Sequence, residues 1–407
     1  MPTSSSVQLL LAHLGLALTY PLFLAWSRGP ILGVGVLLLG GLLSLTTLQN
    51  THFLRQQRIL IILLISCTSL WSIINFLHNE PTSSYDLISR YALTVPILIL
   101  FMYNRPTLKW FFTSCASGAC VALLVACWQL DSTSYERAQG FTGVIQFGDL
   151  SLMMGIFSLT GWLYKKPECG SCQRWIYLLA GLAGLYASFL SGSRGGWIAI
   201  PFIALVVGVS YSNKLNTKRV VLSIAALSAI SVVLIINSNS IHDRVNRAAW
   251  ELNEYKNGNP DTSIGNRLAL WLEASTIIKE HLSIGLPTKD FKNKREVIAD
   301  NNPKLKNAMS LPNTHNSFLE ILVTYGVIGL LPFLILITYT LSGFLKYLRS
   351  ENIELRLSAL CGANLVIGYI IFSQSQVMFQ RNNTLIFFLI SLAYLWGQLY
   401  PLKKTTT

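Results

Sequence analysis

Three short stretches of the sequence combine residue types that can bind a phosphate or move a proton. The first is Ser-Gly-Ser-Arg-Gly-Gly-Trp at residues 191–197, where one arginine stands in a short turn between two apolar runs. An arginine near a membrane is costly unless it pairs with an anion, and small neighbours let a diphosphate approach the backbone. Arg194 is therefore a candidate diphosphate ligand. The alternative is an interfacial arginine that extends toward lipid headgroups.

The second stretch is Gly-Asn-Arg-Leu-Ala-Leu-Trp at residues 265–271. Apolar residues from Ile264 to Leu282 recur at helical spacing, with Thr262 or Ser263 as N-cap, so Arg267 falls in the first turn of a predicted helix. The amides and dipole of a helix N-terminus favour an anion, and a guanidinium can bind phosphate through two hydrogen bonds. Arg267 is a second candidate phosphate ligand; the alternative is an ordinary surface arginine.

The third stretch is Asn-Thr-His-Asn-Ser-Phe-Leu-Glu at residues 313–320, which leads into an apolar run that contains Gly326 and Gly329. His315 stands where the chain enters this run. An imidazole can accept a proton near neutral pH, so His315 is a candidate general base for a substrate hydroxyl. The alternative is a structural histidine at the membrane boundary.

Two arginines and a histidine on one side of a membrane suit a reaction in which a phosphate group leaves. The exported segments carry no Asp-x-Asp or His/carboxylate cluster of the kind that Mg²⁺ or Zn²⁺ requires. The sequence therefore predicts a site without a metal and without a cofactor.

The elements that must position these residues are membrane helices. Of the 407 residues, 52% are hydrophobic and 12% are charged, and the mean hydropathy is +0.49, so a soluble domain would expose a large apolar area. Since a membrane-spanning helix needs about 20 apolar residues, the sequence predicts an all-α polytopic membrane protein of about twelve helices. The predicted spans are 7–26, 31–50, 59–77, 87–103, 110–130, 145–164, 175–191, 196–212, 220–237, 316–344, 357–378 and 384–400.

Lysine and arginine counts orient these spans, because cytoplasmic loops carry more of both. With the N-terminus inside, the inner segments hold fifteen lysines and arginines and the short outer segments hold five. Both termini are thus predicted to be cytoplasmic and the three stretches exported. The net charge of +13 mostly reflects this bias, so it requires no nucleic-acid partner.

We predict three parts along the chain: membrane helices in residues 1–237, an exported loop domain in 238–314, and membrane helices with a cytoplasmic tail in 315–407. In the loop domain, helical spacing predicts one helix over 242–255 and another from Ser263. The remainder, Lys289 to Lys306, is expected to be basic and rich in turns. It is either a solvated face or a surface for an anionic headgroup or phosphorylated substrate.

At these residues the chain resembles the O-antigen ligase and polymerase superfamily of bacterial integral-membrane glycosyltransferases. The resemblance is carried by the Arg194 turn, the helix start at Arg267, and the His315 stretch before a Gly-x-x-Gly helix. A weaker fourth element is Arg-Ala-Gln-Gly-Phe at 137–141, followed by Ile-Gln-Phe-Gly-Asp at 145–149. Many relatives have Asn-Pro after the fourth element, where this chain has Thr-Gly-Val-Ile.

The resemblance implies a ligase that transfers an O-antigen glycan from undecaprenyl diphosphate to a hydroxyl of the lipid A-core oligosaccharide. The reaction would take place at the periplasmic face of the inner membrane, in lipopolysaccharide biosynthesis. Arg194 and Arg267 would hold the diphosphate, and His315 would be the base in an inverting displacement or a cationic diphosphate ligand. Further candidates for substrate binding are Arg137, Gln146, Asn316 and Arg381.

Other functions share parts of this pattern. A polymerase uses the same kind of lipid-linked donor and differs in its acceptor; the basic stretch 289–306 favours a phosphorylated lipid A-core. A protein O-oligosaccharyltransferase is disfavoured by the chain length. A transporter or lipid flippase would carry charges at mid-membrane depth and symmetry between its halves, and the sequence shows neither clearly.

Overall fold

The chain folds as a bundle of α-helices. The computed structural model describes residues 4–48, 51–132, 135–165, 169–211 and 239–404. The membrane part contains α1 (Ser4–Ala25), α2 (Gly29–Leu45), α3 (Arg55–Leu77), α4 (Ser84–Tyr103), α5 (Leu108–Ser132), α6 (Val144–Trp162), α7 (Ser171–Ser191), α8 (Arg194–Trp197), α9 (Ala199–Tyr211), α15 (Ser317–Leu345), α16 (Ile353–Phe372) and α17 (Asn382–Leu399). The predicted all-α class is confirmed.

Seven helices in the described part of the chain are long and apolar enough to cross a membrane: α1, α3, α4, α5, α6, α15 and α16. Helix α2 and residues 195–211 are shorter apolar helices, and α7 and α17 pack against α6 and α16. Many leucine, isoleucine and phenylalanine side chains on the outside of these helices are exposed, as expected for a lipid-facing surface. The protein is a polytopic membrane protein. The predicted span 220–237 lies outside the described residues.

The predicted span 31–50 extends past α2, which ends at Leu45. The largest error in a predicted boundary is at the end of α16. The span predicted at 357–378 corresponds to α16, which ends at Phe372. Residues 373–377 form a loop and Met378–Gln380 a 3₁₀ turn before α17. The polar run Ser-Gln-Ser-Gln at 373–376 explains the early end, since its backbone bonds to the neighbouring Ser317 instead of continuing the helix.

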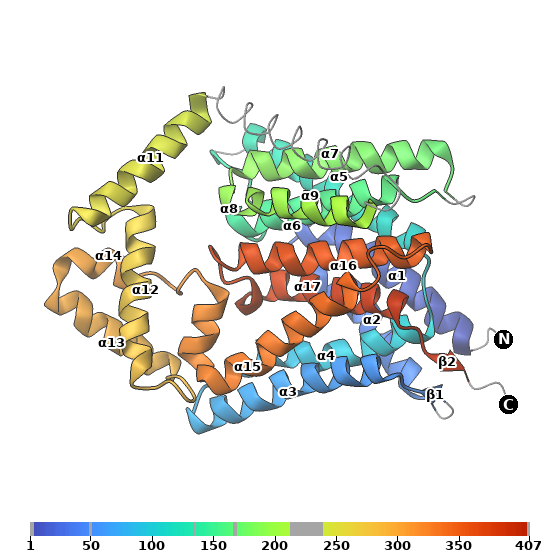
Figure 1. Cartoon of the computed structure of the whole chain (residues 1–407), viewed down its shortest axis with the longest axis horizontal. Helices are drawn as coiled ribbons and strands as arrows, with labels where there is room; N and C mark the ends of the chain where they lie inside the picture. The colour runs from blue at the N-terminus through green and yellow to red at the C-terminus, as the bar shows by residue number, and fades with distance from the viewer. Residues whose placement is uncertain (1–3, 49–50, 133–134, 166–168, 212–238, 405–407) are drawn as a thin grey trace.

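The helices run side by side, with their connections at two opposite ends (Figure 1). At one end, β1 (Thr51–His52) pairs antiparallel with β2 (Lys403–Lys404) near the start of α1. At the other end lie the extramembrane helices α11 to α14. The first and last described elements are therefore on the opposite side of the bundle from the extramembrane helices.

The extramembrane helices are α11 (Asn239–Lys256), α12 (Ser263–Lys279), α13 (Thr288–Asn301) and α14 (Lys306–Met309), with η2 (Pro303–Leu305) between the last two. The two predicted helices are present as α11 and α12. The expected turn-rich tail is instead mostly helix α13. This helix buries Phe291 and Arg295 against the rest of the domain, and Lys292 and Glu296 form an i,i+4 pair on its outer face.

Helix α15 is broken near its start. Gly326 has φ 61° and ψ −166°, a conformation that is essentially restricted to glycine. The loop after α12 fills the break: Val327 N–H donates to Leu282 O at 2.8 Å, and Ile328 N–H to Ser283 O at 3.1 Å. The indole of Trp71 donates to Gly329 O at 2.9 Å. The extramembrane domain is thus anchored directly in the membrane helix that follows His315.

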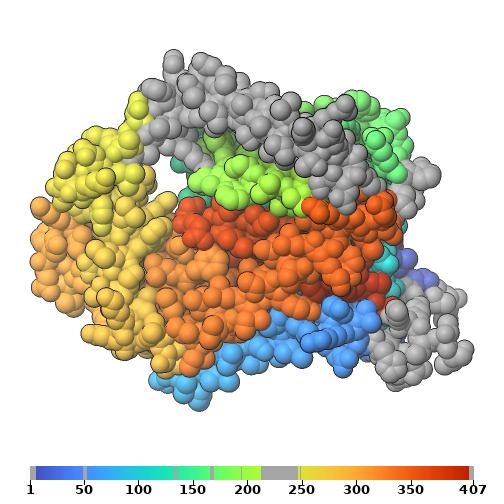
Figure 2. Space-filling view, in the orientation of Figure 1, coloured from blue at the N-terminus to red at the C-terminus, as the bar shows by residue number. Residues whose placement is uncertain are grey.

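Figure 2 shows the surface hollowed between α11 and α12, in yellow, and the green and red ends of the membrane helices. The chain segments that carry the candidate residues converge on this region.

Candidate functional site

His315 lies in the short loop that joins the extramembrane domain to α15. Its φ is 52°, one of two positive φ values among the described residues other than glycine. A left-handed backbone is uncommon for such a residue and persists only where the surroundings impose it. The backbone N–H of His315 donates to Asn313 Oδ1 at 3.0 Å. The loop therefore holds His315 in a conformation that it would not adopt alone.

The imidazole of His315 is half-buried and influenced by two positive charges. Burial, together with the charges of Arg267 and Arg381, lowers its pKa from the usual 6.5 to about 4, while a hydrogen bond with Gln376 opposes the shift. At neutral pH the ring is therefore uncharged. Its Nδ1 atom is buried and has no hydrogen-bond partner among the described residues. The structure thus brings together two guanidinium groups and a neutral imidazole from distant parts of the chain.

Arg267 belongs to the first turns of α12, as predicted, and Thr262 is the N-cap. The Thr262 hydroxyl oxygen accepts the Gly265 N–H at 3.0 Å, and Glu251 Oε2 accepts the Ile264 N–H at 2.9 Å. These two amides are thus already bonded within the chain, which leaves the guanidinium as the anion-binding group. Burial lowers the pKa of half-buried Arg267, and the nearby Glu251 opposes this effect; an arginine stays charged at neutral pH nonetheless.

Arg381 reaches the site from the loop between α16 and α17. This loop is bonded to the start of α15: Ser317 N–H donates to Ser373 O at 2.9 Å, and its hydroxyl donates to Gln376 O at 3.3 Å. Gln380 Nε2 donates to Ser317 O at 3.3 Å. The Nε atom of Arg381 is buried without a partner among the described residues. Two loops at the same end of the bundle therefore act as one unit around His315.

Gln376 was missed by the sequence analysis, which placed it inside a membrane span. Its side chain is buried, and its Oε1 accepts the Val377 N–H at 3.0 Å. The two glutamines and two serines at 373–376, at the end of an otherwise apolar helix, were the feature that could have revealed this loop.

Asn316 is the N-cap of α15. Its Oδ1 accepts the N–H groups of Phe318 and Leu319 at 3.0 and 3.1 Å, and its Nδ2 donates to Gln374 Oε1 at 3.4 Å. The visible role of this residue is to begin the helix beside His315.

The turn that carries Arg194 lies beside the same loop. Gly192 has φ 63° and ends α7, and Arg194 is the first residue of α8; its side chain lies outside what the structure describes. A Cβ at Gly195 would come within 2.5 Å of the Ser375 hydroxyl, and one at Gly196 would collide with the Asp149 carboxylate. The backbone of the turn is therefore packed against the loop that leads to Arg381, at the same end of the bundle as His315.

Arg137 contacts the start of this turn, and Gln146 lies at the start of α6. Arg137 Nε donates to Ser191 O at 2.8 Å. Gln146 is buried at the start of α6, close to Gly143. The four predicted elements thus form one continuous region at this end of the bundle.

The sequence of the chain is similar to known proteins. Residues 178–334 match the family model described as O-antigen ligase. The matched segment runs from α7 to α15 and covers less than half of the chain. An O-antigen ligase of Escherichia coli is 30% identical over 185 residues, which cover 44% of this chain and 42% of that protein. An uncharacterized protein of Haemophilus influenzae is 26% identical over 324 residues, 79% of this chain and 80% of the relative.

The O-antigen ligase domain, as matched, includes Arg194, Arg267 and His315 but ends before Arg381 and begins after Arg137. In the structure, a loop between α16 and α17 that lies outside the matched residues also contributes to the region around His315. Arg381 and Gln376 contact His315 electrostatically or by hydrogen bond although both lie outside the matched residues.

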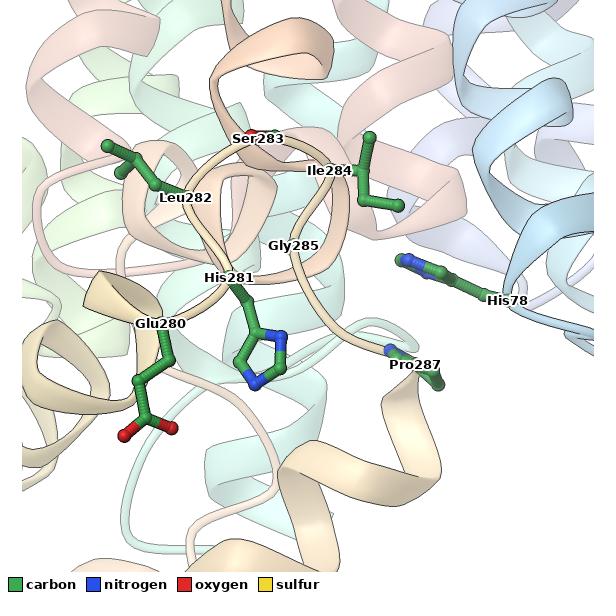
Figure 3. Close-up of a pocket in the computed structure, with 8 residues that line it drawn as sticks. All are labelled: His78, Glu280, His281, Leu282, Ser283, Ile284, Gly285 and Pro287. Carbon is green, nitrogen blue, oxygen red and sulfur yellow. The ribbon is translucent and has the colours of Figure 1, made fainter.

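A separate cavity of about 360 Å³ lies between the end of α3 and the loop after α12 (Figure 3). His78 faces it from the α3 side, and Glu280 and His281 face it from the loop. Lys294 Nζ is 3.1 Å from both Glu280 Oε2 and His281 Nε2. None of the site residues predicted from the sequence lines this cavity, so it is distinct from the region around His315.

Proposed function

We propose that the protein is an O-antigen ligase. It transfers an O-antigen glycan from undecaprenyl diphosphate to a hydroxyl of the lipid A-core oligosaccharide. The observation that carries the proposal is a neutral His315 whose Nδ1 has no partner among the described residues and whose imidazole is influenced by the charges of Arg267 and Arg381. The E. coli relative, an O-antigen ligase by name, supports the same reaction class.

The arginines stabilise the leaving group. As the bond between the anomeric carbon and the diphosphate oxygen breaks, its electron pair moves to the diphosphate, whose charge on that oxygen grows. Fixed guanidinium groups of Arg267 and Arg381, with Arg194 from the neighbouring turn, bind this charge more tightly in the transition state than in the ground state. The energy barrier falls by that difference.

His315 accepts the proton. The acceptor hydroxyl attacks the anomeric carbon from the face opposite the diphosphate, so the new bond forms with inversion, and the hydroxyl proton passes to the imidazole and then to solvent. A pKa of about 4 keeps the imidazole unprotonated but makes it a weak base. The bound diphosphate adds negative charge beside the ring, which raises its pKa and strengthens the base when the donor is present.

This mechanism needs neither a metal nor a cofactor, because the arginines supply the positive charge. The uncharged imidazole of His315 also favours its role as a base over the alternative role as a cationic diphosphate ligand.

The site is proposed to face the periplasm. The charge count predicts cytoplasmic termini, and α1 and β2 begin and end on the side opposite α11 to α14. A bacterial inner membrane with the site at its outer leaflet follows from this orientation and from the proposed donor and acceptor.

The test is the lipopolysaccharide of a strain that lacks the gene. A ligase predicts core without O-antigen on a gel, while polymerised lipid-linked glycan continues to be made. Restoration by the wild-type gene, but not by His315→Ala, completes the test. A single repeat on the core would instead indicate the polymerase, the second candidate, which would use the same donor site.

A further inference from the structure

The residue before His315 is held at every polar atom. Thr314 is fully buried. Its N–H donates to Glu320 Oε2 at 2.8 Å, its carbonyl oxygen accepts from Trp271 Nε1 at 2.6 Å, and its hydroxyl donates to Asn316 O at 2.9 Å. The two peptide groups that flank Thr314 and lead into the left-handed His315 are thus fixed, one by Glu320 of α15 and the other by Trp271 of α12.

The carboxylate of Glu320 has a second neighbour. Arg295, on α13, is buried with 8% exposure, stacks over Phe291 at 4.9 Å and donates through Nη1 to Leu311 O at 2.6 Å. Burial lowers the pKa of Arg295, and the charge of Glu320 opposes this shift, which places the two groups close together. Leu311 and Thr314 belong to the same loop, so Arg295 and Glu320 hold it at two points.

Glu320 does not act on the imidazole by charge. Among the described residues, the charges that influence His315 are those of Arg267 and Arg381. A carboxylate that touched the imidazole would favour its protonated form, whereas here the ring is neutral. The direct link between Glu320 and the site is its hydrogen bond to Thr314.

We propose that Glu320 is a positioning residue for His315: with Trp271 it fixes the peptide groups on either side of Thr314 and imposes the backbone conformation that keeps the imidazole near the two arginines. This inference rests on the proposed function for its catalytic consequence, because the position of His315 matters to transfer. The effect of the Glu320 and Trp271 hydrogen bonds on the imidazole can be measured without an assay of glycan transfer.

The first experiment compares Glu320→Gln with Glu320→Ala. The glutamine oxygen can still accept the Thr314 N–H, so Glu320→Gln should keep kcat within about twofold, whereas Glu320→Ala should lower kcat by about tenfold to a hundredfold because the base is displaced. The KM for the lipid-linked donor should stay nearly constant in both, since the arginines are intact. Glu280→Ala, which removes an exposed carboxylate of the same domain, is the matched control. Equal loss in Glu320→Gln and Glu320→Ala would show that the charge is required and would overturn the proposal.

Trp271→Phe tests the hydrogen bond to the Thr314 carbonyl oxygen. It keeps an aromatic ring but removes the N–H that donates to Thr314 O, and it should lower kcat like Glu320→Ala. The double variant should lose less than the product of the two single losses, because both side chains fix the same residue, Thr314. Trp250→Phe, on the exposed face of α11, is the control. Independent, multiplicative losses of kcat would contradict a joint action of Glu320 and Trp271 on Thr314.

The second measurement is an NMR titration of His315 in detergent, assigned with His315→Gln. In wild type and Glu320→Gln the imidazole should titrate well below 6.5, and in Glu320→Ala its pKa should move up toward 6.5 as the ring leaves the arginines. An unchanged pKa in Glu320→Ala would overturn the positioning role even if transfer were never detected. A chain that shows the shift but transfers no glycan would support the positioning role and refute the proposed function.

Discussion

The carbonyl oxygen of Ser283 occupies the space that a side chain at Gly326 would need. The loop after α12 lies inside the break of α15. The Leu282 and Ser283 carbonyl oxygens accept hydrogen bonds from the N–H groups that the break leaves free. The extramembrane domain and the membrane helix behind His315 are therefore joined through backbone, which restricts how far the arginine of α12 can move from the imidazole.

Gly326→Ala should destabilise the protein by about 1–3 kcal/mol, because an alanine must adopt an unfavourable backbone conformation and displace the Ser283 carbonyl. Thermal unfolding of the protein in detergent measures the change. Gly35→Ala, in α2, is the control, since a Cβ there meets nothing within 4 Å and its φ is ordinary. Equal melting temperatures for the two variants would refute this account of the break.

Arg267→Ala should lower kcat by about a hundredfold to a thousandfold, as expected when a fixed group that stabilises a developing anion is removed. Arg267→Lys should recover part of the loss, since an ammonium keeps the charge but not the planar two-point contact. Transfer to lipid A-core from a defined donor is the measurement. Arg247→Ala, on exposed α11, should retain activity. Full activity of Arg267→Ala would exclude it from the site.

Arg194→Ala should also abolish transfer while the protein still inserts into the membrane. The reason is the position of its turn, packed against Ser375 in the loop before Arg381. Complementation of a deletion strain, with membrane insertion checked by immunoblot, tests this expectation. A variant that inserts and restores O-antigen would remove Arg194 from the list of diphosphate ligands.

The pH profile follows from the lowered pKa of His315. The ring is unprotonated in the free enzyme from pH 7 down to about 4, so the kcat/KM for the donor should not fall through loss of this base until the pH approaches 4. The bound diphosphate raises the pKa, so kcat should fall at a higher pH than kcat/KM does. An acid limb of kcat/KM near 6.5 would contradict the environment described for His315.

Arg381→Met tests one cause of that pKa. Removal of a positive charge beside the imidazole favours its protonated form, so the acid limb of kcat/KM should move to higher pH. The KM for the donor should increase as well, since one diphosphate ligand is lost. An NMR titration of His315 checks the pKa directly. Loss of donor affinity without any change in the titration would mean that Arg381 binds substrate but does not face the imidazole.

The sequence by itself determined the class of protein and most of its helices. Long apolar runs report lipid-facing helices because each run must span the hydrocarbon locally, and start signals such as Thr262 before α12 act within a few residues. The same local character allowed Arg194, Arg267 and His315 to be chosen as candidates. Sequence patterns did not predict two features that depend on tertiary packing. Helix α13 forms because Phe291 and Arg295 are buried against the domain, and α16 ends early because its polar end bonds to Ser317.

The tertiary structure alone decided the state of the imidazole. The pKa of His315 depends on burial and on charges from residues 267 and 381, and its backbone conformation on hydrogen bonds that reach Thr314 from Trp271 and Glu320. Electrostatic and hydrogen-bond energies depend on distance in space, whereas a sequence pattern reports only separation along the chain. For that reason only the tertiary structure shows that Gln376 and Glu320 lie near the loop that carries His315.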